Sequence, residues 1–361
     1  MLNSKTPVVL IADIYYELSD FDQLDLAVLL ARPEFNVRGI MVDQMRTEWG
    51  ARQHDPSYLQ GLCRRFGHGD VPVIAGVSEP LSSPGVDWAE QPAVQFLHEQ
   101  MREAEGDLVV FCWASMTDVM AAWNSADPAT RDGLAAVYAH IGWYHEEIYP
   151  HGIKTRRQWE NNVQLDQAAF FALFASDAPV VWLPCNVGAW YYPLHQRFAD
   201  KRGELYRWLE RELYHYKLIR DLKARREGGR QLYFVSDRDC ALFNPDQPAP
   251  PEQLGDPIRV LETMDRPDIE RRPVLIYETA STYHAVCTHH GRSADGLRVI
   301  RSDLAFGLGD DGVPVMTEDR VGPNGKHRVI VEQSEDVLAE LIEASVGLLE
   351  DEAVKGSMVS A

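Results

Sequence analysis

The chain has 361 residues, enough for one large α/β domain or two ordinary ones. Asp and Glu number 55 against 35 Lys and Arg, and the net charge of −20 repels phosphates, so we expect no nucleic-acid partner. The five cysteines form no CxxC pair, and neither a signal peptide nor a membrane-length apolar run is present, so we expect a cytoplasmic protein without disulfides, structural zinc or a membrane partner.

Strand and helix patterns alternate in the first half of the chain. Apolar runs bounded by turn residues predict strands, and apolar residues at three- and four-residue spacing predict the helices between them. The predicted strands are 7–14, 37–42, 71–75, 108–113, 137–143 and 180–184. The predicted helices are 24–31, 57–66, 91–104, a helix that follows residues 114–118 and runs through Trp123, and 166–174. This alternation is typical of an α/β fold with a mostly parallel central sheet flanked by helices.

The second half has a different character. Residues 191–230 are predicted to form a charged helical region, and the proline-rich residues 244–256 an irregular connection. Short strands with glycine turns are predicted at 274–277, 296–300, 313–316 and 328–331, followed by a closing helix from Ser334. We therefore predict a single domain over residues 1–361 that carries a small C-terminal β-rich extension.

Four acidic residues follow the first predicted strand: Asp13, Glu17, Asp20 and Asp22. Ligands of open α/β sheets bind beyond the carboxyl ends of the strands, and hard cations such as Ca²⁺ need several oxygen ligands. The stretch is therefore a candidate metal site. The alternative is that Asp20 and Asp22 cap the following helix, whose N-terminal N–H groups and dipole favour carboxylates.

Several segments, in the same order, resemble the inosine/uridine-type nucleoside hydrolases. They are the opening acidic stretch with residues 32–40 behind it, residues 112–119, residues 160–166, residues 234–245, and the closing strand and helix at 328–349. The resemblance implies a nucleoside hydrolase-like, Rossmann-like fold that holds one Ca²⁺ ion at the strand ends. It also implies hydrolysis of an N-ribosidic bond by a water that the metal activates.

The resemblance also implies roles for individual residues. The expected metal ligands are Asp13, Asp20, Asp22, the Thr117 backbone carbonyl and Asp237. Asp13 is also the expected general base. The residues expected to bind the ribose or the base are Asp43, Gln44, Trp159, Glu160 and Asn162. Simpler roles remain as alternatives, since Thr117 could cap a helix, and Glu160 and Asn162 could be ordinary polar residues of a loop.

The chain departs from the family pattern where the leaving base is protonated. Ser236 stands where many members have a histidine, and residues 82–88 lack the family's other histidine. The remaining substitutes are His145, His151 and His284. The opening acidic motif is also stretched, which leaves Glu17 as a further ligand, and residues 255–325 are predicted to be a family-atypical insertion.

Two functions follow as alternatives. The favoured one is a Ca²⁺-dependent hydrolase of the N-glycosidic bond of a ribonucleoside or modified nucleoside, acting in purine or pyrimidine metabolism. The rival is a non-catalytic or altered-function nucleoside hydrolase-like protein that binds a ribosyl ligand, because both leaving-group histidines are missing. In either case we expect a small-molecule partner and a homo-oligomer, either a dimer or a tetramer.

Overall fold

The computed structural model describes residues 5–14, 22–45, 56–144, 160–209, 274–309 and 314–359, apart from residues 199, 202 and 207. A nine-stranded sheet forms its centre. Its strands are β1 (Thr6–Ala12), β2 (Phe35–Val42), β3 (Val73–Ala75), β4 (Leu108–Trp113), β5 (Leu134–His140), β6 (Val180–Leu183), β9 (Leu297–Leu308), β10 (Pro314–Val321) and β11 (His327–Gln333). A separate antiparallel pair consists of β7 (Trp190–Tyr192) and β8 (Val274–Ile276).

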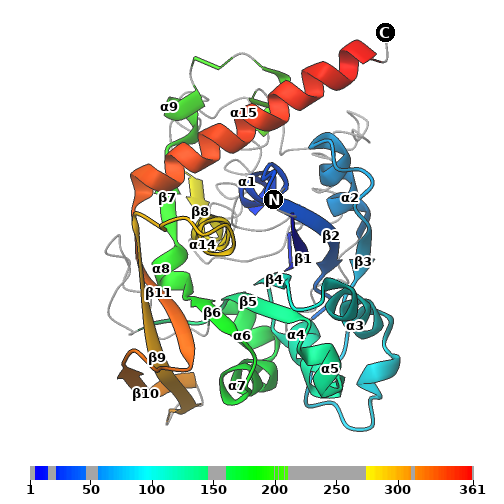
Figure 1. The fold of residues 1–361 in the computed structure, drawn as a ribbon, viewed down its shortest axis with the longest axis vertical. Helices are drawn as coiled ribbons and strands as arrows, with labels where there is room; N and C mark the ends of the chain where they lie inside the picture. The colour runs from blue at the N-terminus through cyan, green and yellow to red at the C-terminus, as the bar shows by residue number, and fades with distance from the viewer. Residues whose placement is uncertain are drawn as a thin grey trace, which may run out of the picture.

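The strand order in the large sheet is β10-β9-β11-β6-β5-β4-β1-β2-β3 (Figure 1). The strands from β11 to β3 pair in parallel, while β9 and β10 form antiparallel pairs at the other edge. The predicted fold class, a mostly parallel α/β sheet with antiparallel strands near the C-terminus, is confirmed. Since the parallel strands share one direction, the loops after β1, β2, β4 and β5 meet at one edge of the sheet.

Helices cover both faces of this sheet. They are α1 (Asp22–Leu30), α2 (Pro56–Arg65), η1 (Trp88–Glu90), α3 (Pro92–Ala104), α4 (Thr117–Ser125), α5 (Pro128–Arg131), α6 (Asn161–Leu165), α7 (Gln167–Ala175), α8 (Cys185–Gly188), α9 (Leu194–Phe198), α14 (Thr279–His289) and α15 (Glu335–Val359). Helices α1, α2, α14 and α15 pack in the core on one face, and α3, α4 and α7 pack in the core on the other (Figure 1). None of the described helices combines the length and apolar character that crossing a bilayer needs.

Strand β1 shows why the parallel strands have continuous apolar sequences. Val8, Leu10 and Ala12 are buried in the core below α1, α14 and α15. Val9 and Ile11 are buried in the core below α3, α4 and α7. Both faces of the strand are therefore removed from water, which is typical of a central strand in a parallel sheet.

The predicted strands and helices of the first half are present, most of them with shifted ends, but the short helices α5, α6 and α8 and the longer helix α14 were not predicted. Helix α14 lacks the apolar periodicity that predicts a helix, because its buried face carries the polar residues Ser281, Thr282 and His284. Strands β9 and β10 are much longer than predicted, because half-exposed polar residues interrupt their apolar pattern. Most of residues 191–230, and all of 244–256, lie outside the described residues.

The buried His284 of α14 makes stability depend on pH. Its Nδ1 lies 2.9 Å from the Tyr138 hydroxyl, and burial lowers the pKa of His284 from 6.5 to about 4. Between these values the unfolded chain binds more protons than the folded one, so the free energy of unfolding falls as the pH drops through this window. Between pH 7 and pH 4 we expect the free energy of unfolding to fall by on the order of 2 kcal/mol less in His284→Gln than in the wild type. Urea denaturation at the two pH values measures this difference. Identical pH profiles for the two proteins would contradict this.

Candidate functional site

Two aspartates lie side by side at the carboxyl edge of the sheet. Asp13 comes directly after β1 and Asp43 directly after β2. The last residue of β1, Ala12, is in register with Val42 of β2 and with Trp113 of β4. Both aspartates are buried. The strand register therefore places Asp13 and Asp43 at this edge, and their roles stay predictions.

Asp43 is bonded to backbone groups of the edge loops. Its Oδ1 accepts from the Met45 N–H at 2.6 Å, and its Oδ2 accepts from the Ser115 N–H at 2.8 Å. The neighbouring Gln44 is buried, and its side-chain amide donates to the Val42 carbonyl at 3.1 Å. Asp43 thus joins the loop after β2 to the loop after β4, and its role in substrate binding, like that of Gln44, stays a prediction.

Thr117 connects two further elements of the edge. Its buried hydroxyl donates to Asp166 Oδ2 at 2.8 Å and lies 3.0 Å from the Ser115 hydroxyl. The alternative that Thr117 caps its helix is wrong, because the N-cap position of α4 is Met116 and carries no side-chain cap. The side chain of Thr117 therefore fixes α4 against the start of α7.

Asp166 holds three segments together. Its Oδ2 also accepts from the Leu81 N–H at 2.7 Å, while its Oδ1 caps α7 by accepting from the Ala169 N–H at 3.1 Å. We expect Asp166→Ala to lower the free energy of unfolding by about 2–4 kcal/mol, because several buried donors lose their acceptor. Chemical denaturation measures this, and the exposed Asp70→Ala is the control, expected to change it by less than about 0.5 kcal/mol. Equal stabilities of the two variants would contradict the role of Asp166.

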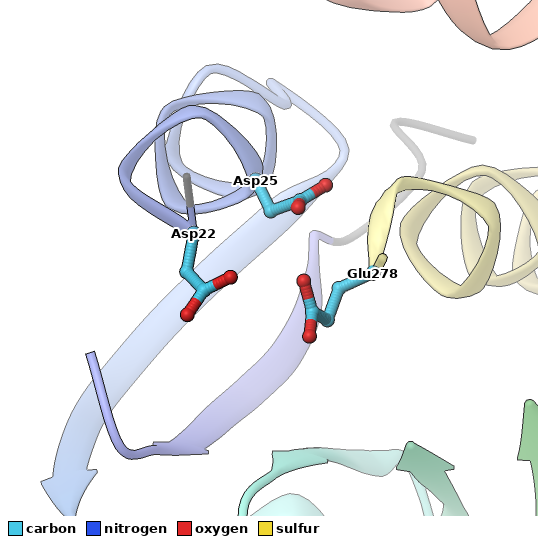
Figure 2. A group of neighbouring side chains, drawn as sticks. All are labelled: Asp22, Asp25 and Glu278. Carbon is cyan, nitrogen blue, oxygen red and sulfur yellow. The ribbon is translucent and has the colours of Figure 1, made fainter. Parts of the chain in front are cut away.

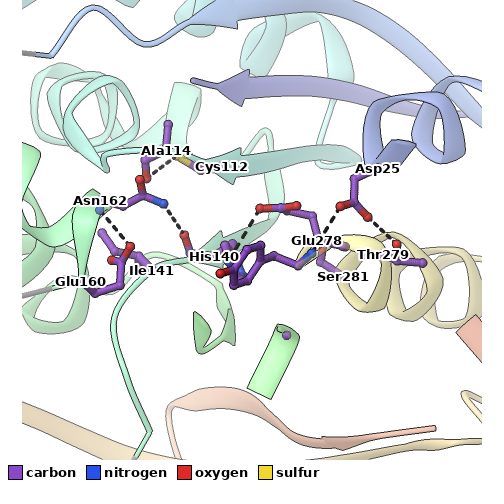
Figure 3. Close-up of polar contacts among 12 residues, drawn as sticks. Asp25, Cys112, Ala114, His140, Ile141, Glu160, Asn162, Glu278, Thr279 and Ser281 are labelled. Carbon is purple, nitrogen blue, oxygen red and sulfur yellow. Dashed lines mark hydrogen bonds and ion pairs between the residues drawn. The ribbon is translucent and has the colours of Figure 1, made fainter. Parts of the chain in front are cut away.

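Glu160 caps α6. Its carboxylate accepts from the backbone N–H groups of Asn162 at 2.9 Å, Val163 at 3.1 Å and Gly142 at 2.9 Å. Burial raises the pKa of Glu160. The side-chain amide of Asn162 donates to the carbonyl of His140, the last residue of β5, at 3.2 Å (Figure 3). Both residues lie beyond the carboxyl end of β5, as a substrate-binding role requires, although Glu160 has this structural role as well.

Three buried carboxylates gather between α1 and α14: Asp22, Asp25 and Glu278 (Figure 2). One oxygen of each lies within 4.8 Å of the others. Their exposed fractions are 8%, 0% and 4%, respectively. Asp22 begins α1, Asp25 follows one turn later, and Glu278 immediately precedes α14. Of the three, only Asp22 was expected as a metal ligand.

Sequence signals for the other two residues do exist. Asp25 interrupts an apolar helix and is flanked by the fully buried Leu24 and Leu26. Glu278 follows the short strand β8, which places a carboxylate shortly after the carboxyl end of a strand. A charged residue on a buried helix face, or directly beyond a strand, is thus the pattern that predicts such a cluster.

The cluster fits a hard divalent cation. All of its donors are carboxylate oxygens, the ligand type that Ca²⁺ and Mg²⁺ prefer. Burial raises the pKa of Asp25, because a carboxylate in this environment is stable only with compensating bonds or charge. A bound cation would supply that charge to Asp22, Asp25 and Glu278.

His140 joins this cluster to the neighbouring residues of the edge. Its Nε2 lies 3.7 Å from Glu278 Oε1, and its ring packs 5.5 Å from that of Tyr277, measured between centroids (Figure 3). Burial lowers the pKa of His140 to about 3. The imidazole is therefore neutral near pH 7 and is not suited to protonating a leaving base.

Part of the predicted site lies outside the described residues. The residues concerned are Glu17, Asp20, His145, His151, Trp159, Ser236 and Asp237. Their roles stay predictions.

No family model matches the chain, and no curated protein matches it in sequence. Solved structures do match. A plant nucleoside hydrolase superposes with a TM-score of 0.58 at 12% identity, covering 95% of this chain and 99% of that one. A purine-preferring ribonucleoside hydrolase from Gardnerella vaginalis superposes with a TM-score of 0.57 at 16% identity, with the same coverage.

The chain has the nucleoside hydrolase fold. The type III effector protein XopQ, solved in complex with adenosine diphosphate ribose, shares the fold as well, with a TM-score of 0.57 at 13% identity over 96% of this chain and 94% of that one. The nucleoside hydrolase fold thus occurs both in enzymes and in an effector. The fold by itself therefore does not assign an activity to this chain.

Within this nucleoside hydrolase fold, the carboxylates lie where chemistry on a ligand is expected. His140 ends β5 and lies 3.7 Å from Glu278, so the cluster is at the carboxyl edge of the sheet. Asp13 follows the last residue of β1 at the same edge. The edge thus carries a cluster of carboxylate oxygens, the further buried carboxylates Asp13 and Asp43, and the polar side chain of Asn162.

Proposed function

We propose that the protein is a Ca²⁺-dependent hydrolase of the N-glycosidic bond of a ribonucleoside or modified nucleoside. The observation that carries this proposal is the buried Asp22, Asp25 and Glu278 cluster at the carboxyl edge of a nucleoside hydrolase fold. The inosine-uridine preferring nucleoside hydrolase from Bacillus anthracis also has this fold, with a TM-score of 0.53 at 14% identity over 95% of this chain and 99% of that one, which supports the substrate class.

The proposed cation is held by carboxylates from two parts of the chain. Asp22 and Glu278 supply oxygens from the cluster, and the sequence adds Asp13, Asp20, the Thr117 carbonyl and Asp237 to the proposed set. When bound, the cation supplies positive charge that lowers the pKa of a neighbouring water. Asp13 accepts the proton from that water as general base, because it is a buried carboxylate at the end of the central strand β1.

The ribose is proposed to bind on the β5 side of the edge. The bond from the Asn162 side chain to the His140 carbonyl fixes the orientation of its amide, so little rotamer freedom is lost when a hydroxyl binds. The other proposed ribose or base contacts are Asp43, Gln44, Trp159 and Glu160. Hydrogen bonds to sugar hydroxyls that strengthen in the transition state contribute to the rate.

Two buried histidines, His140 and His284, are poor proton donors, which favours a substrate whose leaving base needs no protonation. Burial lowers the pKa of His140 to about 3 and that of His284 to about 4, so both are neutral near pH 7. His284 also contacts the Tyr138 hydroxyl in the core. A modified nucleoside whose base is cationic departs as a neutral molecule without a proton donor, and it suits a protein with a net charge of −20.

A panel of nucleosides tests the proposed reaction. Inosine, guanosine, adenosine, uridine, cytidine and the cationic 7-methylguanosine are incubated with the protein and Ca²⁺, and free base and ribose are quantified by chromatography. We expect base and ribose in equal amounts, with 7-methylguanosine cleaved fastest. If no member of the panel releases its base, the proposed reaction is wrong.

A second candidate function is binding of a ribosyl ligand without turnover. The observation that favours it is the shared fold of the XopQ effector solved with adenosine diphosphate ribose. Isothermal titration with adenosine diphosphate ribose and with each nucleoside separates the two functions. Binding without any cleavage product supports the second, whereas catalytic release of base supports the first.

A further inference from the structure

The two residues beside Glu278 are both bonded to Asp25. The Tyr277 N–H donates to Asp25 Oδ2 at 3.3 Å, and the Thr279 hydroxyl donates to Asp25 Oδ1 in a short hydrogen bond (Figure 3). Each oxygen of Asp25 therefore accepts from a residue that flanks Glu278. This contact joins α1 to the start of α14 across a wide separation in the sequence.

The carboxylate of Asp25 has a different direction from the other two of the cluster. In Figure 2 the carboxylate of Asp25 points towards the start of α14, whereas those of Asp22 and Glu278 lie in the space between α1, β1 and α14. Asp25 and Thr279 are both fully buried. A buried carboxylate that accepts hydrogen bonds from several groups fixes the groups that donate to it, because leaving any of them unbonded costs free energy.

The rest of Glu278 is also fixed. Its backbone carbonyl accepts from the Ser281 N–H at 3.0 Å and from the Ser281 hydroxyl at 2.6 Å. Its carboxylate lies 3.7 Å from the His140 imidazole, which limits how far it can swing towards β5. The backbone of Glu278 is thus held from both sides, and its carboxylate lies beside those of both Asp22 and Asp25.

We propose that Asp25 and Thr279 form a clamp that presents Glu278 to a divalent cation, with Asp25 acting as a positioning residue and not as a metal ligand. This inference rests on the metal site of the proposed function. In this arrangement Asp22 and Glu278 bind the cation, while Asp25 orients Glu278. Residues that orient metal ligands typically change affinity about 10–100-fold when they are replaced.

Thr279 tests the clamp without touching a carboxylate. Thr279→Val removes the hydroxyl at constant shape, and Thr279→Ser keeps it. We expect Thr279→Val to weaken Ca²⁺ binding about 10–100-fold by isothermal titration, and Thr279→Ser to stay within about threefold of wild type. Asp25→Asn, which cannot accept both bonds, should weaken binding by a similar factor, and the double variant Asp25→Asn with Thr279→Val should be no weaker than the worse single variant.

Two further measurements separate a loss of Ca²⁺ binding from a loss of folding. The melting temperature of each metal-free variant reports whether it folds, and the rise in that temperature on adding Ca²⁺ reports binding independently of activity. If Thr279→Val does not fold, Thr279→Ala replaces it in the comparison. Strong weakening by Asp25→Asn, together with wild-type affinity in Thr279→Val, makes Asp25 a ligand and overturns the clamp.

Failure of this inference and failure of the proposed function give different results. Ca²⁺ binding that depends on Thr279 supports the clamp even when no nucleoside is cleaved, and that outcome contradicts only the proposed function. A wild-type protein that binds no Ca²⁺ overturns the clamp. If base release then persists in the presence of chelator, the protein is a nucleoside hydrolase whose activity does not need Ca²⁺.

Discussion

Replacing Glu278 with glutamine should weaken Ca²⁺ binding by at least about 100-fold and reduce base release in parallel, because the cation loses a charged oxygen ligand in a buried site. The substitution preserves the shape of a side chain that is 4% exposed, so the fold is expected to persist. Isothermal titration gives the affinity, and initial rates at a series of Ca²⁺ concentrations show whether added metal restores activity. Recovery at high Ca²⁺ is the expected pattern for a weakened site.

The exposed Glu335, at the start of α15, provides the matched control for this result. Glu335→Gln makes the same chemical change away from the cluster and should leave the Ca²⁺ affinity within about twofold, as is usual for surface substitutions. Wild-type affinity in Glu278→Gln would remove Glu278 from the metal site, and with it the structural basis for a cation between α1 and α14.

The second large effect is expected at Asp13. Asp13→Asn leaves a side chain of the same size at the end of β1 but removes the base that accepts the proton from water. We expect kcat to fall by about 10²- to 10⁴-fold at saturating Ca²⁺, with a much smaller change in KM. Steady-state kinetics on the best nucleoside of the panel measures both constants.

The control for Asp13 is the exposed Asp70, whose replacement by asparagine should leave kcat unchanged. A loss confined to KM in Asp13→Asn would assign Asp13 to substrate binding and not to proton transfer. If the loss vanishes at high Ca²⁺, Asp13 is a metal ligand without the role of base.

Much of the fold follows from the sequence because the parallel strands are buried on both faces. Runs such as residues 108–113 are continuously apolar, and β4 begins and ends at those residues. Helix α14 could not be predicted in the same way, since Ser281, Thr282 and His284 occupy buried positions that are usually apolar. Their partners come from other parts of the chain, as the contact of His284 with Tyr138 shows, and a local pattern does not contain that information.

For the candidate site too, a local sequence pattern predicts some residues, whereas others depend on contacts between distant parts of the chain. Asp13 and Asp22 could be predicted because both stand in the stretch that follows the first strand. The contribution of Glu278 depends on packing α14 against α1, far away in the sequence, and the role of Asp25 depends on the residues that flank Glu278. Glu160 illustrates a second limit, because a carboxylate that caps a helix has the same sequence signature as one that binds a sugar.

The most direct test of the central claim is the rate of base release by metal-free protein as Ca²⁺ is added back. The protein is stripped with chelator, dialysed and supplied with increasing Ca²⁺ at a fixed concentration of the best nucleoside. We predict a rate close to zero without metal and a saturable rise as one ion per chain is bound. A rate that is the same in chelator, or base release that is absent at every Ca²⁺ concentration, would contradict the account.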